Sequence, residues 1–411
     1  MNAVLLLIGL LVLSSLGSLL MTRRSGGGAG LTSGVEYAAL GFVLGPQALG
    51  LVGAKDLTAF EPVVQVAIGW LAFAVGLDFG FSDDRRVRGG SFALGSMSAG
   101  VTGGGVAVAT WFATRWLKAG LTGTERVLLS GALGAACSET SRRAARWVAD
   151  RYRVRAGPLT RSLDELAHVD SLLPLVAVAV LFALDPSRDV VCPMPLWQWP
   201  AVTVGSAILL GAGAALLLRS EIATEDAWGV LFGVSLLAIG VAARLALATL
   251  TTTFFMGIAV AALSSHRREL RAMVGPTERP VLLPALLLAG ARLDFRATPA
   301  LPWLAAVAIG ARVAAKILVG CVLCAGSRSA RKAGVLVGLS LMSSGSLAIC
   351  VGLAFALRFP GTVGDTVLAV AVLSAIVGEL LGPARLRRSL LAAGEIEEAT
   401  AHTSAPDKAL V

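Results

Sequence analysis

The sequence predicts an all-α protein that crosses a membrane many times. Hydrophobic residues make up 56% of its 411 residues, charged residues only 15%, and the mean hydropathy is +0.78. The apolar residues are gathered in runs of about 20, which is the length that a helix needs to cross a bilayer. The 47 glycines are typical of helices that pack closely in lipid. This composition is that of an integral membrane protein.

Thirteen segments are apolar enough to be predicted as transmembrane helices. They are residues 3–21, 34–52, 62–81, 91–113, 127–147, 163–184, 200–218, 226–243, 247–264, 278–294, 301–324, 333–356 and 363–383. The first segment lacks the basic region and the small-residue cleavage site of a signal peptide, so we expect a true transmembrane helix. After Ala393 the chain is polar, and residues 394–411 are predicted to form a short cytoplasmic tail that is too small for a soluble domain.

The net charge of +9 is carried mainly by alternate connections between these segments. Arg23 and Arg24, the basic stretch 142–161 and the arginines between 385 and 388 all fall in this set. The positive-inside rule places such connections in the cytoplasm, so the N-terminus is predicted outside and the C-terminus inside. We expect a multi-pass protein of the inner membrane whose basic loops contact anionic lipid and do not bind nucleic acid.

Three pairs of similar segments occur in the same order in the two halves of the chain. They are Leu-Asp-Phe at 77–79 and 293–295, the glycine-containing segments 41–46 and 254–258, and the polar segments 137–142 and 342–346. The charge bias puts the first Leu-Asp-Phe at the cytoplasmic face and the second at the outer face. Corresponding segments in opposite orientation predict inverted repeats, which are common in secondary transporters.

Two polar interruptions predict discontinuous helices, one in the segment 127–147 and one in the segment 333–356. Non-helical backbone is tolerated in a membrane only where it is buried in protein or lines an aqueous cavity. A broken helix offers carbonyl oxygens to a cation, and its ends need countercharges. The alternative is that the hydroxyls bond within or between ordinary helices, and that Glu139 marks the helix emerging into the cytoplasm. The residues concerned are Ser138, Glu139, Thr140, Ser141, Ser343, Ser344, Gly345 and Ser346.

Asp170 is an acidic residue inside the otherwise apolar segment 163–184. An acid at that depth costs roughly 2.5–3.5 kcal/mol on insertion scales and normally serves ion or proton handling. Arg312 and Lys316 lie four residues apart, and so on one face of a predicted helix. Lysine can release its proton in a dry site whereas arginine keeps its own, so we expect Lys316 to join a proton cycle and Arg312 to be a fixed positive partner. The alternative for Lys316 is snorkelling to the cytoplasmic interface.

The sequence does not favour an enzyme or a cofactor-binding protein. His168 precedes Asp170 by two residues, and side chains at that spacing point about 200° apart on a helix, so a catalytic His–Asp pair is not expected. No nucleophile completes a hydrolase site nearby. Cys321 and Cys324 match a C-x-x-C spacing, but they lie in an apolar segment without the βαβ context of a redox motif.

Taken together, these segments resemble the monovalent cation/proton antiporter superfamily, which includes bacterial sodium/proton exchangers and Kef-type transporters. The resemblance extends over nearly all of residues 1–385. The matching segments are 40–51 with Gly-x-x-x-Gly-Pro, 72–78 with Phe-x-x-Gly-Leu-Asp, 138–146 at the first discontinuous helix, 311–316 at a basic helix and 338–353 at the second discontinuous helix.

The resemblance implies a single transmembrane unit over residues 1–393, in which two discontinuous helices cross around an ion-binding aspartate. It implies a core of about 62–184 and 278–383 and a dimerisation scaffold of about 3–52 and 200–264. An elevator-like movement of the core, and a homodimer, are implied in the same way.

The chain departs from the family pattern beside Asp170, where Val169 stands in the place of a first acid that many members have. With one acid left, we predict electroneutral exchange of one monovalent cation for one proton, with sodium as the expected cation and potassium as the alternative. The expected ligands are Asp170, Thr140, Ser141 and Ser138, with sodium held transiently at Asp170 and Thr140, while Arg312, Lys316 and Glu139 are the expected charge partners.

Two other functions fit the same sequence. One is a sodium-coupled transporter of an organic anion, in which Arg142 and Arg143 at the first interruption contact the substrate. The other is a sensor that has lost transport, which the missing acid beside Asp170 favours.

Overall fold

The computed structural model describes residues 34–79, 81–82, 85–86, 89–117, 120–155, 157–185, 194–219, 224–296 and 298–396. The predicted helix at 3–21 lies outside these residues. The described chain is helical except for connections and a pair of two-residue antiparallel strands, β1 (Phe81–Ser82) and β2 (Arg85–Arg86). The predicted all-α class is therefore confirmed.

The described helices lie at the predicted apolar segments, but three of them differ in their bounds. In chain order they are α2 (Val35–Leu44), α3 (Ala54–Ala59), α4 (Glu61–Asp78), α5 (Gly89–Trp116), α6 (Gly123–Ser138), α7 (Arg142–Arg151), α8 (Pro158–Val169), α9 (Leu172–Ala183), α10 (Gln198–Leu217), α11 (Thr224–Arg244), α12 (Thr249–Leu263), α13 (Arg267–Ala291), α14 (Leu301–Gly326), α15 (Arg328–Ala333), the 3-10 helix η2 (Val335–Leu341), α16 (Ser346–Arg358) and α17 (Thr362–Ala393). The helix α2 ends at Leu44 and not at residue 52, α13 begins at Arg267 and not at residue 278, and α17 continues to Ala393 past residue 383.

Several of these helices are long and apolar enough to cross a bilayer. There are seven among the described residues, counting α8 and α9 together, and η2 with α16 makes an eighth, bent span. The chain is thus a multi-pass membrane protein, whereas the count of thirteen spans remains a prediction.

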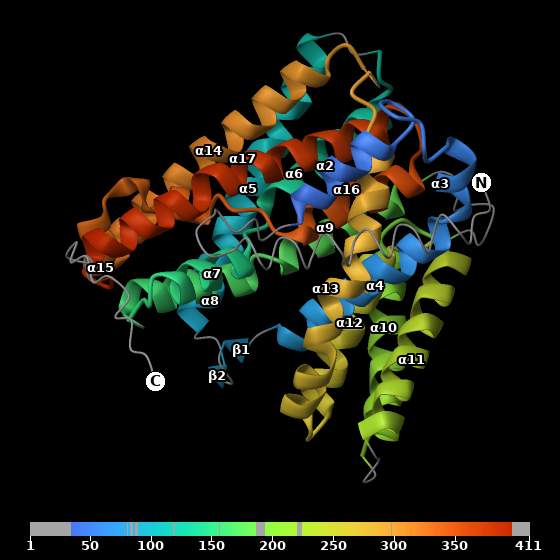
Figure 1. Ribbon diagram of the computed structural model, residues 1–411, viewed down its shortest axis with the longest axis horizontal. Coiled ribbons are helices and arrows are strands. Elements are labelled where there is room, and N and C mark those ends of the chain that lie inside the picture. The colour runs from blue at the N-terminus through green and yellow to red at the C-terminus, as the bar shows by residue number, and fades with distance from the viewer. Residues whose placement is uncertain are drawn as a thin grey trace, which may run out of the picture.

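The helices form two groups that are inclined to each other (Figure 1). One group contains α4, α10, α11, α12 and α13, and the other contains α5, α6, α14, α16 and α17, with α7 and α8 beneath it. The helix α4 packs against α12 and α13, although its residues fall in the range expected for the core. The division into core and scaffold remains a prediction.

Two close helix contacts that involve the first group match each other. In α13, a Cβ on Gly290 would overlap the carbonyl oxygen of Ala38 in α2. In α4, a Cβ on Gly76 would overlap the carbonyl oxygen of Phe254 in α12. The repeated Leu-Asp-Phe segments make α4 the counterpart of α13, and the repeated glycine segments make α2 the counterpart of α12. The contact between α4 and α12 therefore corresponds to the contact between α13 and α2. This correspondence is the packing expected of two interlocked repeats.

The second group shows the same correspondence. A Cβ on Gly134 of α6 would overlap the carbonyl oxygen of Gly103 in α5. A Cβ on Gly338 of η2 would overlap the carbonyl oxygen of Lys316 in α14. In both halves, a glycine therefore lets the first part of the discontinuous helix lie against the backbone of the long helix before it, α5 for α6 and α14 for η2.

Both predicted discontinuities are present. The helix α6 ends at Ser138 and α7 begins at Arg142, while η2 and α16 are separated by residues 342–345 and bent by 58°. The two breaks touch, because the backbone N–H of Ser141 donates to the backbone carbonyl of Ser343 at 2.7 Å. This hydrogen bond replaces partners that the broken helices cannot supply, as buried backbone requires.

Candidate ion-binding site

Asp170 lies beside the crossing of the two discontinuous helices, at the C-terminal end of α8. Its side chain is completely buried. The hydroxyl of Thr140, in the first break, donates to Asp170 Oδ2 at 2.6 Å. The other carboxylate oxygen, Oδ1, has no hydrogen-bond partner among the residues that the structure describes. A buried carboxylate with one unoccupied acceptor is a group that can take a proton or a cation.

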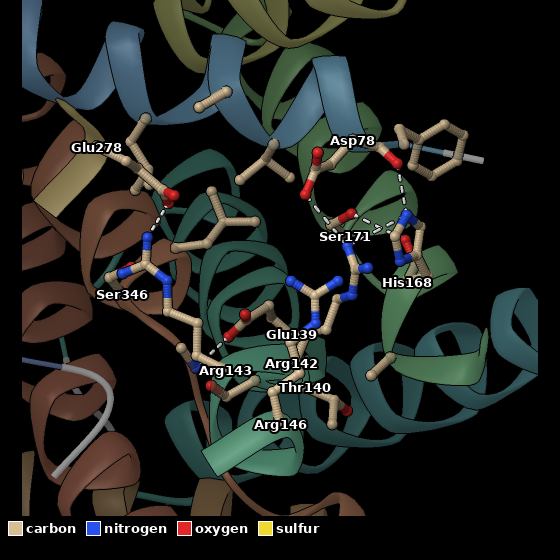
Figure 2. Close-up of a pocket in the computed structure, with 18 residues that line it drawn as sticks. Asp78, Glu139, Thr140, Arg142, Arg143, Arg146, His168, Ser171, Glu278 and Ser346 are labelled. Carbon is tan, nitrogen blue, oxygen red and sulfur yellow. Dashed lines mark hydrogen bonds and ion pairs between the residues drawn. The ribbon is translucent and has the colours of Figure 1, made fainter. Parts of the chain in front are cut away.

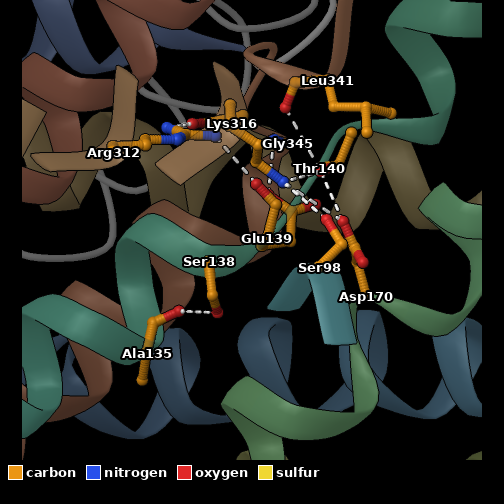
Figure 3. Close-up of polar contacts among 11 residues, drawn as sticks. Ser98, Ala135, Ser138, Glu139, Thr140, Asp170, Arg312, Lys316, Leu341 and Gly345 are labelled. Carbon is orange, nitrogen blue, oxygen red and sulfur yellow. Dashed lines mark hydrogen bonds and ion pairs between the residues drawn. The ribbon is translucent and has the colours of Figure 1, made fainter. Parts of the chain in front are cut away.

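Lys316 of α14 is the basic residue that reaches Asp170. Its Nζ donates to Thr140 Oγ1 at 2.9 Å and lies 3.4 Å from Asp170 Oδ2, forming a salt bridge between two completely buried side chains (Figure 3). A third contact, at 3.4 Å, is to the Ser98 hydroxyl of α5. Lys316 therefore points into the protein and does not snorkel to the surface.

Arg312 lies one turn before Lys316 and contacts the backbone of the first break at Glu139. Its Nη2 donates to the backbone carbonyl of Glu139 at 2.9 Å, and its Nη1 donates to the hydroxyl of Ser374 at 2.8 Å and to that of Ser344. Glu139 follows the last residue of α6, where the helix dipole is negative, so the guanidinium neutralises this helix end.

Glu139 places a negative charge at the helix N-terminus that follows the second break. Its carboxylate accepts the backbone N–H of Gly345 at 2.6 Å, and Gly345 is the residue that precedes α16. A negative charge at a helix N-terminus stabilises the helix dipole and the free N–H groups there. Arg312 and Glu139 are thus the countercharges of the two buried helix ends.

The remaining predicted site residues lie near the crossing but contact other groups. Ser141 Oγ accepts the backbone N–H of Ala144 at 3.2 Å and caps α7. Ser138 Oγ donates to the carbonyl of Ala135 at 2.9 Å within α6, away from Asp170 (Figure 3). The backbone of Ser343 accepts from Ser141. The structure therefore gathers Asp170, Thr140 and Lys316, whereas the hydroxyls of Ser138 and Ser141 are used within their own helices.

A cavity of about 150 Å³ lies against this site. Its lining includes Glu139, Thr140 and Ser171, which border Asp170, and it extends to Asp78, Arg142, Arg143 and Glu278, which belong to a set of ion pairs among α4, α7, α8 and α13 (Figure 2). The pairs are Arg142 with Asp78 at 3.2 Å, Arg142 with Asp164 at 3.4 Å, Arg143 with Glu278, and Arg271 with Asp78. The cavity offers a polar approach to Thr140 from one side of the crossing.

His168 points into this cavity and away from Asp170, as its spacing predicted. Its Nε2 is hydrogen-bonded to the backbone carbonyl of Asp78 and lies 3.4 Å from Arg142 Nη1. A His–Asp pair of the kind a hydrolase uses is therefore not formed.

Several residues of the site were not predicted as site residues, among them Ser98, Ser374, Asp78 and Glu278. Ser98 and Ser374 each lie in an apolar helix, and a single serine there carries no signal that distinguishes it from a packing residue. Asp78 was noted only as part of a repeated segment, and Glu278 was not singled out at all. The position of each acid at the end of a membrane segment, opposite a basic stretch, is the signal that would have found both.

Comparison with known proteins gives a likeness of fold. No family model and no curated protein matches the sequence. The structure of the sodium proton antiporter MjNhaP1 from Methanocaldococcus jannaschii at pH 8 is similar, with a TM-score of 0.68 at 14% identity, covering 95% of this chain and 98% of that one. An electron-microscopy structure of the same antiporter gives a TM-score of 0.66 at 15% identity, covering 95% and 97%. The chain has the fold of a sodium/proton antiporter. This agrees with the superfamily resemblance of the sequence.

Proposed function

We propose that this antiporter-fold protein exchanges a monovalent cation for a proton, with Asp170 as the shared binding group. The observation that carries the proposal is the Asp170 carboxylate, completely buried, with one oxygen held by Thr140 and Lys316 and the other without a partner among the described residues. Hard monovalent cations prefer oxygen ligands, and Asp170 and Thr140 supply such ligands beside the two breaks.

The stoichiometry of the exchange follows from the net charge of the Asp170–Lys316 pair. Without a cation, Asp170 and Lys316 together hold one proton and carry no net charge, because they form an ion pair. A cation bound to Asp170 displaces the proton that Asp170 and Lys316 share. The proton leaves from the Lys316 ammonium, because a lysine can lose its proton in a dry site whereas an arginine cannot. One cation thus replaces one proton and the net charge of the site stays at zero, which makes electroneutral exchange the expected stoichiometry. Sodium is the expected cation and potassium the alternative.

The cavity supports alternating access. It reaches Thr140 from the side of the Arg142 and Arg143 ion pairs, and these pairs join α7 to α4 and α13 of the other helix group. An elevator-like shift of the helices that carry Asp170 relative to α4 and α13 would break these pairs and close this approach. We further propose that the protein is a homodimer in the inner membrane with its N-terminus outside.

The organic-anion alternative is less favoured by the geometry. Arg142 is paired with Asp78 and Asp164, and Arg143 is paired with Glu278, so the positive charges that an anion would need are already neutralised. No described contact favours the sensor alternative.

The test is cation-driven proton movement in proteoliposomes, followed with a pH-sensitive dye for sodium, lithium and potassium. The wild type is expected to move protons against at least one of the three cations, and Asp170→Asn is expected to lose this activity. Asp150→Asn is the matched control, because Asp150 is an exposed aspartate on α7.

Two results would contradict the proposal. Exchange that persists in Asp170→Asn at the wild-type rate removes Asp170 from the site. A membrane potential whose sign follows the sodium gradient excludes one-for-one electroneutral exchange.

A further inference from the structure

The N-terminus of α8, the helix that ends at Asp170, is capped by a residue from the far end of the chain. The carboxylate of Glu395 accepts the backbone N–H of Leu159 through Oε1 at 2.7 Å and the backbone N–H of Thr160 through Oε2 at 2.8 Å. The hydroxyl of Thr160 also donates to Oε2, at 2.5 Å. The Glu395 side chain thus takes up both free backbone donors in the first turn of α8.

The local sequence provides no cap of its own for this helix. The residue before α8 is Gly157, which has no side chain, and the first helical residue is Pro158, which has no N–H. Leu159 and Thr160 therefore need an acceptor from elsewhere. Glu395 is 235 residues away in sequence and only 6% exposed, so its charge is committed to this contact.

The backbone around Glu395 is fixed in the same place. Gly394 has φ +77°, a left-handed conformation that favours glycine, and it turns the chain back toward the protein after α17. The carbonyl of Glu395 accepts the backbone N–H of Arg155 at 3.0 Å. The side chain of Ile396 is 8% exposed and belongs to the apolar cluster that contains Leu159 and Leu166. The start of the predicted tail is therefore docked against α8.

We propose that Glu395 is a positioning residue for the ion-binding site, acting through α8 on Asp170. The helix has 12 residues and is about 18 Å long, so it links the Glu395 contact to Asp170 as a rigid rod. Asp170 must lie within hydrogen-bond distance of Thr140 and close to Lys316 to hold a proton or a cation. Fixing the start of α8 holds its other end in that position. This inference rests on the proposed exchange function.

The test compares Glu395→Gln and Thr160→Val with the wild type. Glutamine keeps one acceptor oxygen but loses the charge, and valine removes only the hydroxyl contact, so both variants are expected to fold. Glu269→Gln is the matched control, because the side chain of Glu269 is 75% exposed and pairs locally with His266. Three quantities are measured on the full chain: deuterium exchange of residues 158–169, the pH midpoint for labelling of Asp170 by a carbodiimide, and the apparent KM for sodium.

In Glu395→Gln, we expect deuterium exchange in the first turn of α8 to become about 2- to 30-fold faster, the range that loss of a helix cap gives for a local opening. The labelling midpoint of Asp170 is expected to move to higher pH, because a displaced α8 takes the carboxylate away from Lys316. The apparent KM for sodium is expected to rise more than the maximal rate falls. Thr160→Val should show the same changes to a smaller extent, and the control should show none.

The proposal is overturned if α8 exchanges faster while the Asp170 midpoint and the KM stay at wild-type values, since Glu395 would then stabilise the helix without positioning the site. A wild type that moves none of the three cations would instead refute the proposed function. In that case, the carbodiimide midpoint still decides whether Glu395 sets the surroundings of Asp170.

Discussion

The two breaks at the centre of the protein look alike in sequence but complete their hydrogen bonds in different ways. At the first break, Ser141 is the residue that precedes α7, and its hydroxyl accepts the backbone N–H of Ala144, three residues on. At the second break, α16 begins after Gly345, whose N–H is taken by the carboxylate of Glu139, 206 residues away. The first break is capped by its own sequence, and the second is capped by the first.

This difference assigns separate tasks to the two segments. The first break supplies the polar side chains, because Thr140 contacts Asp170 and Glu139 caps the partner helix. The second break supplies mainly backbone, through the carbonyl of Ser343 and the amide of Gly345. Substitutions in the first break should therefore affect both stability and transport. Substitutions in the second break should act by changing how the two discontinuous helices pack where they cross.

The largest effect is expected from Arg312→Leu. The variant removes the guanidinium that donates to the backbone carbonyl of Glu139 and to the hydroxyls of Ser374 and Ser344, and it takes away one of the two cations that attract the buried Glu139 carboxylate. Buried acceptors left unpaired cost about 1–3 kcal/mol each, and more where the lost partner is charged. The melting temperature in detergent measures the loss. Adding Glu139→Gln to Arg312→Leu should recover part of it, because the uncompensated charge is then removed. A double variant that melts below both single variants would contradict this account of the crossing.

Two variants compare the helix caps at the breaks. Glu139→Ala removes the cap of α16 that comes from a distant part of the chain, and Ser141→Ala removes the cap of α7 that comes from the adjoining residue. The first variant leaves a buried amide without its charged acceptor and is expected to cost about 2–3 kcal/mol. The second removes an ordinary helix cap and is expected to cost about 1 kcal/mol. Equal losses in unfolding experiments would mean that the two breaks do not differ in the way described.

Gly345→Ala tests how tightly Glu139 fits the second break. A Cβ at this position would lie 2.5 Å from Glu139 Oε1, so the carboxylate must move from the amide that it caps, at a cost of about 1–3 kcal/mol. Gly310→Ala in α14 is the control, because its Cβ would meet nothing within 4 Å, and here we expect a gain of up to about 1 kcal/mol. Similar melting temperatures for the two variants would argue against a close fit.

The smallest effect is expected at the N-terminus of α6, which is capped entirely by nearby residues. Thr122 accepts the N–H of Glu125, and Glu125 accepts the N–H of Thr122 at 2.8 Å. The backbone and hydroxyl hydrogen bonds from Thr122 lower the pKa of Glu125 below its ordinary value. The folded pKa is below the unfolded one, so this contribution to stability is present above the ordinary glutamate pKa and is lost as the pH falls through the lowered value.

Thr122→Ala is therefore expected to cost about 1 kcal/mol or less at neutral pH, and less still in acid. Melting temperatures over a pH series measure the change, with Thr58→Ala as a control on an exposed threonine of α3. A Thr122→Ala deficit that grows in acid would contradict the sign derived for Glu125.

Much of the architecture follows from the sequence. The apolar runs fix which residues become helices, because a helix satisfies every backbone group within one segment of chain. The polar runs at 138–141 and 343–346 give the positions of both breaks, and the spacing of Arg312 and Lys316 places them on one helical face. These features are local, so residue type and periodicity are enough to predict them.

Which charged side chain contacts which group depended on the tertiary structure. Three contacts join residues that are far apart in the sequence. They are Asp170 with Lys316, Glu139 with Gly345 and Glu395 with α8, at separations of 146, 206 and about 235 positions. In each case, the partner is set by which helices pack together, and the close approaches at glycines such as Gly338 decide that packing. Sequence alone therefore showed that Asp170 is an acid in the membrane. Only the packed structure decided that Lys316, and not Arg312, is the base beside it, because the two side chains leave the same helical face at different heights.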